Sequence, residues 1–130
     1  MNFPVVSDTE RRLLLSAQVS TALPVGVKHD TDKLPLDLLD PLALEGLAAV
    51  LQFGAKKYAA HNWRGGLSYS RLIAALLRHT FALLRGEDTD KESGLPHIDH
   101  VGCCWMFLSN AMKTRKDLDD RYTPKSRSAE

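Results

Sequence analysis

The sequence predicts an all-α fold: a helical bundle of three long helices, with one short helix near the N-terminus. Apolar residues recur every three or four positions over long segments, and residues that start or stop helices separate those segments. No alternating apolar and polar run is long enough for a strand. The 130 residues have room for one domain with a buried core. We expect an N-terminal arm (1–24), a helical domain (25–113) and a charged tail (114–130).

The N-terminal part of the chain combines the short helix with loops. Residues Glu10 to Gln18 form a short amphipathic stretch, and Pro24 and Gly26 indicate a loop after it. The segment 28–33, Lys-His-Asp-Thr-Asp-Lys, is wholly polar and is typical of a loop.

The first long helix begins at a clear signal. Asp40 precedes Pro41, an order that places a capping carboxylate before a proline at the first helical position. The helix should extend to about Tyr58, because one apolar stripe continues that far. The stripe consists of Leu44, Leu47, Leu51, Ala55 and Tyr58. The segment 61–66, His-Asn-Trp-Arg-Gly-Gly, then breaks the helix.

Two further long helices follow, joined by an acidic loop. The second should cover about 68–85, with Gly86 as its C-terminal stop. Residues 87–95 form the loop, and a proline opens the third helix, which should cover about 96–113. The tail beyond it is charged, rich in serine and interrupted by Pro124, so we expect it to fray.

The third helix is unusual because it has no polar face. Residues 101–108 read Val-Gly-Cys-Cys-Trp-Met-Phe-Leu, which is apolar on every side. Such a helix must be covered all round, and three or four helices of one chain cannot easily do that. We therefore expect a homo-oligomer, a dimer or a tetramer, to complete the bundle.

Composition and charge exclude several kinds of partner. The 17 basic residues nearly balance the 16 acidic ones, so a net charge of +1 gives no global attraction to nucleic acid or to an anionic membrane. No apolar run approaches the roughly 18 residues that span a bilayer, and residues 1–12 lack the pattern of a secretory signal. Cys103 and Cys104 are adjacent, which fits two buried, inert thiols in a reducing compartment. We expect a cytoplasmic protein that binds neither polymeric nucleic acid nor membrane.

Three histidines and a run of acids could form a metal site. On the second helix, His79 lies between an apolar stripe and a strip of alanines that leaves room beside it. His97 and His100 are three positions apart, so they share the inward face of the third helix. Imidazole and carboxylate together suit divalent ions. The loop between the two helices supplies the carboxylates Glu87, Asp88, Asp90 and Glu92.

Each part of this pattern also has a plainer interpretation. Arg71, Arg78 and Arg85 form a strip next to His79, so the second helix alone could carry a solvated arginine stripe beside a core histidine. The acidic loop alone could be a solvated turn, and it lacks the central Gly and terminal Glu of a calcium-binding loop. Buried polar groups without partners cost about 1–3 kcal/mol, however, and this favours a site in which the inward imidazoles have partners.

Groups that could bind phosphates and a nucleobase lie at the end of the first long helix and just after it. An amide and a flat ring suit base-edge hydrogen bonds and stacking, although lysines at a helix end could merely interact with the helix dipole. These groups are Lys56, Lys57, Tyr58, Asn62, Trp63 and Arg64. Lys28 and Lys33 add positive charge in the earlier loop. Because no glycine-rich phosphate loop is present, metal and side chains would have to hold the phosphates.

Several short strings together resemble a known family. They are Lys28-His29-Asp30 with Lys33, Phe53 to Tyr58 with Asn62-Trp63 and Gly66, Arg78-His79, Gly86-Glu87-Asp88 with Asp90, and Glu92 to His97 with His100. Over about 25–112, the combination resembles the bacteriophage dATP/dGTP pyrophosphohydrolases, the MazZ-type branch of the MazG-like all-α NTP pyrophosphatases. The resemblance implies hydrolysis of a dNTP to monophosphate and pyrophosphate, two or three Mg²⁺ or Mn²⁺ ions, and dimers or tetramers. In phages that replace adenine with 2-aminoadenine, it also implies a supply of dGMP and depletion of dATP.

The chain departs from the wider superfamily in its metal ligands. MazG-like proteins typically carry carboxylates as ExxE and, on a later helix, ExxD, and neither pattern is present on the predicted helices here. On this resemblance, His79 would replace an acid of the earlier helix, while His97 and His100 would take the ExxD positions. The loop residues Glu87, Asp88 and Glu92 would complete the ligand set.

The residues suggest a division of roles in such a reaction. Divalent ions would neutralise a triphosphate that carries about four negative charges. Arg78, with Lys56 or Lys57, would stabilise the polyphosphate charge, and Glu92 or Glu87 would act as the base that orients water. The other substrate-binding candidates are Lys33, Tyr58, Asn62 and Trp63, of which the last two would meet the nucleobase.

Two other functions are compatible with the sequence. The dipeptide His29-Asp30 is typical of HD-type phosphohydrolases, although here it lies in a loop before the first long helix. The apolar third helix would also suit a non-enzymatic interaction module with a structural metal, although such a site uses only about four ligands. The products separate the three: pyrophosphate for the first, triphosphate or phosphate for the second, and none for the third.

Overall fold

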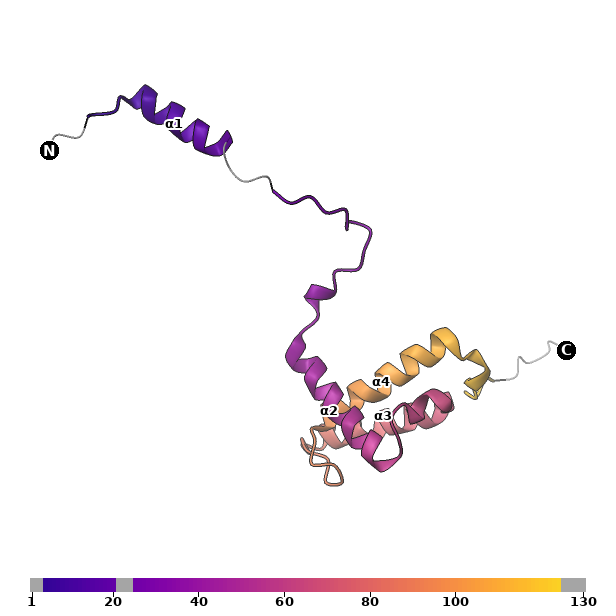
Figure 1. Cartoon of the computed structure of the whole chain (residues 1–130). Coiled ribbons are helices and arrows are strands. Elements are labelled where there is room, and N and C mark those ends of the chain that lie inside the picture. The colour runs from indigo at the N-terminus through magenta and orange to yellow at the C-terminus, as the bar shows by residue number, and fades with distance from the viewer. Residues whose placement is uncertain (1–3, 21–24, 125–130) are drawn as a thin grey trace. The chain divides into compact units, whose positions relative to one another are not determined.

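The computed structural model describes residues 4–20 and 25–124, and within these ranges it contains four α-helices and three short 3-10 helices (Figure 1). The described residues form no strand, only an isolated antiparallel bridge between Thr89 and Pro96. The predicted all-α class is confirmed. No helix in the described ranges is long and apolar enough to cross a membrane. The chain divides into two compact units, Met1–Pro35 and Leu36–Glu130.

The first unit contains α1 (Asp8–Ser20) and a non-helical segment after it. A capping box starts α1: the Ser7 hydroxyl accepts a hydrogen bond from the Glu10 amide at 3.2 Å, and the Glu10 carboxylate accepts one from the Ser7 amide at 2.8 Å. The short helix predicted over Glu10 to Gln18 is therefore confirmed. The loop predicted around Pro24 and Gly26 lies partly outside the described residues, because Pro24 is not among them.

In the second unit, η1 (Leu36–Leu38) precedes α2 (Pro41–Lys57), and α2 starts at the predicted signal. The Asp40 carboxylate accepts a hydrogen bond from the Ala43 amide at 2.9 Å, and Pro41 occupies the first helical turn. The helix ends one residue before Tyr58, close to the predicted end, and η2 (Asn62–Gly65) follows the break.

The other two long helices, α3 (Tyr69–Leu84) and α4 (His97–Thr114), lie side by side, and α4 also packs against α2 (Figure 1). Their bounds agree with the predicted ones to within one residue. Tyr69 is 2% exposed and donates a hydrogen bond through its hydroxyl to the Ala111 carbonyl at 3.1 Å, which ties α3 to α4. Burial raises the pKa of the Cys103 thiol to about 12, so this thiol is inert, as the sequence predicts.

The α2–α4 crossing brings a glycine against a carboxylate. A Cβ atom on Gly46 would lie 2.5 Å from Oδ2 of Asp99, and one on Gly102 would lie 3.3 Å from the Leu47 side chain. The Asp99 side chain therefore faces α2. Only a residue without a side chain permits this approach at position 46.

The expectation that the chain frays after α4 is wrong for its described part. The helix η3 (Lys116–Leu118) follows α4, and the Asp120 carboxylate accepts hydrogen bonds from the Ser70 amide, at 2.9 Å, and from the Ser70 hydroxyl. Ser68, the N-cap residue of α3, makes no side-chain cap bond itself. Asp120 thus caps α3 from a distant part of the sequence. Residues 125–130 of the predicted tail lie outside the described residues.

Candidate functional site

The candidate site lies where α3 ends and α4 begins, and the connecting loop closes tightly on itself. Backbone hydrogen bonds join the Asp90 amide to the Leu95 carbonyl at 2.9 Å and the Gly94 amide to the Asp90 carbonyl at 2.8 Å. Gly94 has a φ of +71°, a left-handed conformation that favours glycine. The His97 amide donates to the Asp88 carbonyl at 2.8 Å. These bonds fold the loop back onto the start of α4.

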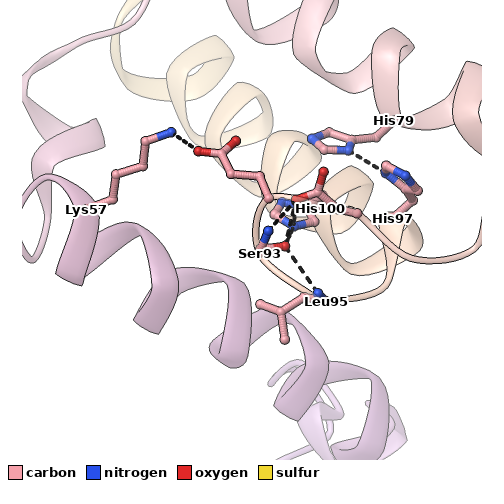
Figure 2. Close-up of polar contacts among 8 residues, drawn as sticks. Lys57, His79, Ser93, Leu95, His97 and His100 are labelled. Carbon is pink, nitrogen blue, oxygen red and sulfur yellow. Dashed lines mark hydrogen bonds and ion pairs between the residues drawn. The ribbon is translucent and has the colours of Figure 1, made fainter.

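The three predicted histidines converge here (Figure 2). The Nδ1 atoms of His79 and His97 lie 2.8 Å apart, and the His79 ring stacks on His100 with a centroid distance of 4.5 Å and an interplanar angle of 10°. Asp90 completes a group with His79 and His97 whose ligand atoms all lie within 4.8 Å of one another. Within the described residues, this is the one group of three or more such side chains.

Local electrostatics favour neutral rings and an ionised acid. Burial, followed by the nearby His100 and His97, lowers the pKa of His79. Burial also lowers the pKa of His100, against the opposing charge of Asp90. Burial alone would raise the pKa of Asp90, but hydrogen bonds from Ser93 outweigh it and lower that pKa. Neutral imidazole and ionised carboxylate are the forms that bind metal ions.

The geometry of the group fits a divalent cation. Two ligand atoms at right angles around an ion, each about 2.1 Å from it, lie about 3 Å apart, which is close to the 2.8 Å between the His79 and His97 nitrogens. Imidazole nitrogens suit zinc, copper, iron and nickel, whereas magnesium and manganese prefer oxygen ligands such as carboxylates and water. A set of two imidazoles and one carboxylate therefore fits a first-row transition-metal ion, Mn²⁺ included, better than Mg²⁺.

The other acids of the loop are placed differently. Glu87 forms an exposed ion pair with Arg85 at 3.2 Å, and this hydrogen bond lowers the pKa of Glu87. Glu92 pairs with Lys57 at the end of α2 (Figure 2). Asp88 has an exposed side chain and contributes its backbone carbonyl to the loop. The structure thus separates Glu87, Asp88 and Glu92 from the group that Asp90 joins.

The ligand set taken from the resemblance left out Asp90, the loop acid that the structure groups with His79 and His97. A usable signal was present: Asp90 stands three positions before Ser93, a spacing at which a carboxylate accepts the serine amide and hydroxyl in a tight turn. That turn orients Asp90, whereas its neighbours in the loop have no comparable anchor to the histidines.

The predicted phosphate-binding residues lie in several places. Arg78 is exposed on α3 next to His79. Burial raises the pKa of Cys104 on α4, and the positive charge of Arg78 opposes this effect. Lys57 pairs with Glu92, and this hydrogen bond raises the pKa of Lys57. Lys56 is exposed beside it. Lys33 belongs to the first unit, Met1–Pro35.

The remaining predicted substrate-binding residues line a cavity of about 590 Å³ between α2, the segment after it and α4. These residues are Tyr58, Asn62 and Trp63. Trp63 stacks on Phe107 with a centroid distance of 4.6 Å, and the Arg64 guanidinium lies 4.4 Å from the Trp63 ring centroid. Neighbours in the protein thus hold the indole in the cavity wall. Lys57, next to Tyr58 in the chain, pairs with Glu92 of the acidic loop.

Comparisons with known proteins identify the family of the chain. Residues 25–121 match the family described as dATP/dGTP diphosphohydrolase, N-terminal. The chain is also similar to a dATP/dGTP diphosphohydrolase of Salmonella phage PMBT28, with 41% identity over 96 residues, which cover 74% of this chain and 33% of the relative. The chain thus spans about a third of the length of that relative, and no solved structure matches it. With a family match over most of its length, the chain belongs to the dATP/dGTP diphosphohydrolase family, in the region that the N-terminal description covers.

Proposed function

We propose that the protein hydrolyses dATP and dGTP to the deoxynucleoside monophosphate and pyrophosphate, with a divalent cation held by His79, Asp90 and His97. The observation that carries the proposal is the grouping of these three ligands within 4.8 Å at the junction of α3 and α4. Membership of the family supports the substrate and the bond cleaved. The relative from Salmonella phage PMBT28 carries the activity in its name and is about three times as long as the matched segment.

The cation would be Mn²⁺ or Mg²⁺, and a triphosphate would bring in one or two further ions. When bound, such ions neutralise phosphate charge and lower the pKa of a coordinated water. Two imidazoles favour Mn²⁺ over Mg²⁺ at the protein-bound position. We therefore expect Mn²⁺ to support activity at a lower concentration than Mg²⁺ does.

The residues around the cation group would bind and orient the polyphosphate. Lys57, Lys56 and Arg78 supply positive charge near the site, and Lys33 remains a candidate from the first unit. In the absence of substrate, Lys57 forms an ion pair with Glu92. A phosphate that binds Lys57 would break this ion pair and leave the Glu92 carboxylate unpaired. Glu92, or Glu87, would then accept a proton from the attacking water. Positioning and charge neutralisation account for most of such a reaction.

The nucleoside would occupy the cavity beside α2. Its volume of about 590 Å³ is ample for a base and sugar, and Asn62 supplies an amide for base-edge hydrogen bonds. Tyr58 follows Lys57 directly in the chain, so a nucleotide with its base in the cavity could present its phosphates to that lysine. Trp63 would form part of the wall, because Phe107 already stacks on its ring.

We also propose that the protein works as a homo-oligomer, a dimer or a tetramer. On α4, Ile98, Trp105 and Met112 recur every seven residues and are 58%, 61% and 45% exposed. On α3, Phe81 and Leu84 are 51% and 85% exposed. Large exposed apolar side chains on two adjacent helices favour contact with another protein surface. A second copy of the chain would cover the exposed apolar side chains of α4.

In a phage that makes 2-aminoadenine DNA, this activity would supply dGMP and deplete dATP. The reaction would take place in the host cytoplasm, where deoxynucleotides are made and where Cys103 and Cys104 would remain reduced. Neither polymeric nucleic acid nor a membrane is part of the proposal.

Product analysis tests the proposed function. The full chain is incubated with each dNTP and Mn²⁺, and the products are separated by ion exchange. We expect pyrophosphate and a monophosphate from dATP and dGTP. Release of triphosphate or phosphate, together with loss of activity in His29→Ala, would instead support the HD-type reaction. If a folded, metal-loaded protein turns over no dNTP, the remaining interpretation is the non-enzymatic interaction module.

A further inference from the structure

Ser93 connects two polar side chains of the candidate site. Its amide donates a hydrogen bond to Oδ2 of Asp90 at 3.0 Å, and its hydroxyl lies 2.7 Å from the same oxygen. The hydroxyl also lies 2.7 Å from Nε2 of His100 and accepts a hydrogen bond from the Leu95 amide at 3.2 Å (Figure 2). Asp90 and His100 keep only 18% and 11% of their side-chain surface exposed, so water competes weakly for these bonds.

The protons in this cluster can be assigned from the number of donors. A hydroxyl has one proton, and the ionised Asp90 carboxylate can only accept, so the Ser93 hydroxyl donates to Asp90. Nε2 of His100 must then carry a hydrogen and donate it to Ser93. The neutral His100 ring is thereby fixed as the Nε2–H tautomer. With the Leu95 amide as a second donor, all bonding positions of the hydroxyl oxygen are used.

We infer that Ser93 is a positioning residue of the cation site: it fixes the rotamer of Asp90 and both the orientation and the tautomer of His100. The Asp90 carboxylate cannot rotate without losing both bonds from Ser93. His100 in turn stacks on His79, so the same serine indirectly orients the His79 ring. His100 then acts as a support for the site, with Nε2 engaged by Ser93 and not available to a cation. This inference rests on the proposed cation site.

Partners that orient ligands of a metal contribute strongly to its affinity. Losing one such partner typically weakens binding by about 10–100-fold. Ser93→Ala removes the hydroxyl and its bonds to Asp90, His100 and the Leu95 amide, while the backbone amide remains. Ser93→Thr keeps a hydroxyl at the same place. Ser109→Ala removes a hydroxyl on α4 that accepts a hydrogen bond from Lys113, and it serves as the matched control.

The experiment measures Mn²⁺ affinity and the His100 tautomer in the full-length protein, without nucleotide. Mn²⁺ binding is followed by titration calorimetry, and the tautomer by ¹⁵N shifts of the imidazole in metal-free protein at slightly alkaline pH. We expect Ser93→Ala to weaken Mn²⁺ binding by about 10–100-fold and to shift His100 from one tautomer to a mixture. Ser93→Thr should restore both properties, and Ser109→Ala should change neither.

The outcomes separate this inference from the proposed function. If Ser93→Ala keeps the wild-type affinity and the wild-type tautomer while the unmodified protein binds Mn²⁺ and releases pyrophosphate, the role of Ser93 is overturned and the function stands. If Ser93→Thr fails to restore what Ser93→Ala loses, the role of the hydroxyl is also overturned. If the unmodified protein binds no Mn²⁺, the proposed cation site itself fails.

Discussion

His79 and His97 lie on different helices, and their Nδ1 atoms are 2.8 Å apart. A neutral imidazole carries one N–H, so at this distance one ring donates to the other. If both rings were protonated, two like charges would face each other across a hydrogen bond. The pair is therefore stable only while at most one ring is charged, and a cation would take the place of the shared proton.

Acid should destabilise the metal-free protein below about pH 6.5. Burial, and then His100 and His97, hold the pKa of His79 below its ordinary value of 6.5, to which it returns on unfolding. The unfolded chain then binds more protons than the folded one, so the free energy of unfolding falls as the pH drops through this window. Melting temperatures measured against pH in the presence of a chelator test this. The dependence should become shallower in His79→Gln, where the lowered pKa of His100 still contributes, and it should be unchanged in His29→Gln. Equal slopes in all three proteins would contradict the assignment to His79.

Exchanging the charges of Lys57 and Glu92 should preserve their ion pair. It should not preserve substrate binding, because we propose that Lys57 itself contacts the phosphates. Lys57→Gln should raise KM for dGTP, because a phosphate contact is lost, with little change in stability since the pair is largely exposed. The exchange Lys57→Glu with Glu92→Lys keeps an ion pair and should still raise KM, and it should also lower kcat where Glu92 acts as the base. Steady-state kinetics measure both, with Lys113→Gln as the control. A wild-type KM in the exchanged protein would show that Lys57 has only a structural role.

Two glycines of α2 should respond in opposite directions to alanine. Gly46→Ala places a Cβ atom 2.5 Å from Asp99 Oδ2 and should destabilise the protein by about 1–3 kcal/mol, as overpacking does. A Cβ atom on Gly54 would meet no neighbouring atom within 4 Å, and Gly54→Ala should stabilise the helix by about 0.5–1 kcal/mol. Denaturant unfolding measures both. Adding Asp99→Ala to Gly46→Ala should recover part of the loss, and equal effects at both glycines would refute the close approach.

Asp120 should contribute to stability although it follows the last long helix. Its carboxylate accepts both hydrogen bonds from Ser70 at the start of α3, so Asp120→Ala should cost about 0.5–2 kcal/mol, the usual cost of losing a helix cap. The adjacent Asp119 forms an exposed ion pair with Arg121, and Asp119→Ala should cost far less. Thermal unfolding compares the two variants. A chain ended at residue 113 should lose at least as much stability as Asp120→Ala; full stability after that truncation would contradict the cap.

The sequence predicted the helices well because their signals are local. Asp40 and Pro41 fix the start of α2 through a cap that involves only neighbouring residues. Helical periodicity also places His97 and His100 on one face, and the short connection then requires them to lie near His79. Convergence of the three rings follows from these two facts alone.

The features that the sequence could not provide depend on tertiary contacts or on loop backbone. Which loop acid joins the histidines depends on the turn closed by Gly94 and on hydrogen bonds from Ser93, so Asp90 reaches the site while Glu92 turns to Lys57. The capping of α3 by Asp120 joins residues that are 50 positions apart. No local pattern encodes either contact.

The most direct test of the account is Mn²⁺ binding by the unmodified protein and by His79→Ala, His97→Ala and Asp90→Asn. Circular dichroism checks that each variant keeps its helices, and His29→Ala, a change at an exposed histidine of the first unit, is the control. The account predicts that the unmodified protein and the control bind Mn²⁺ and release pyrophosphate from dGTP, whereas each of the three site variants loses both properties. Wild-type Mn²⁺ affinity and turnover in the three folded variants would contradict it.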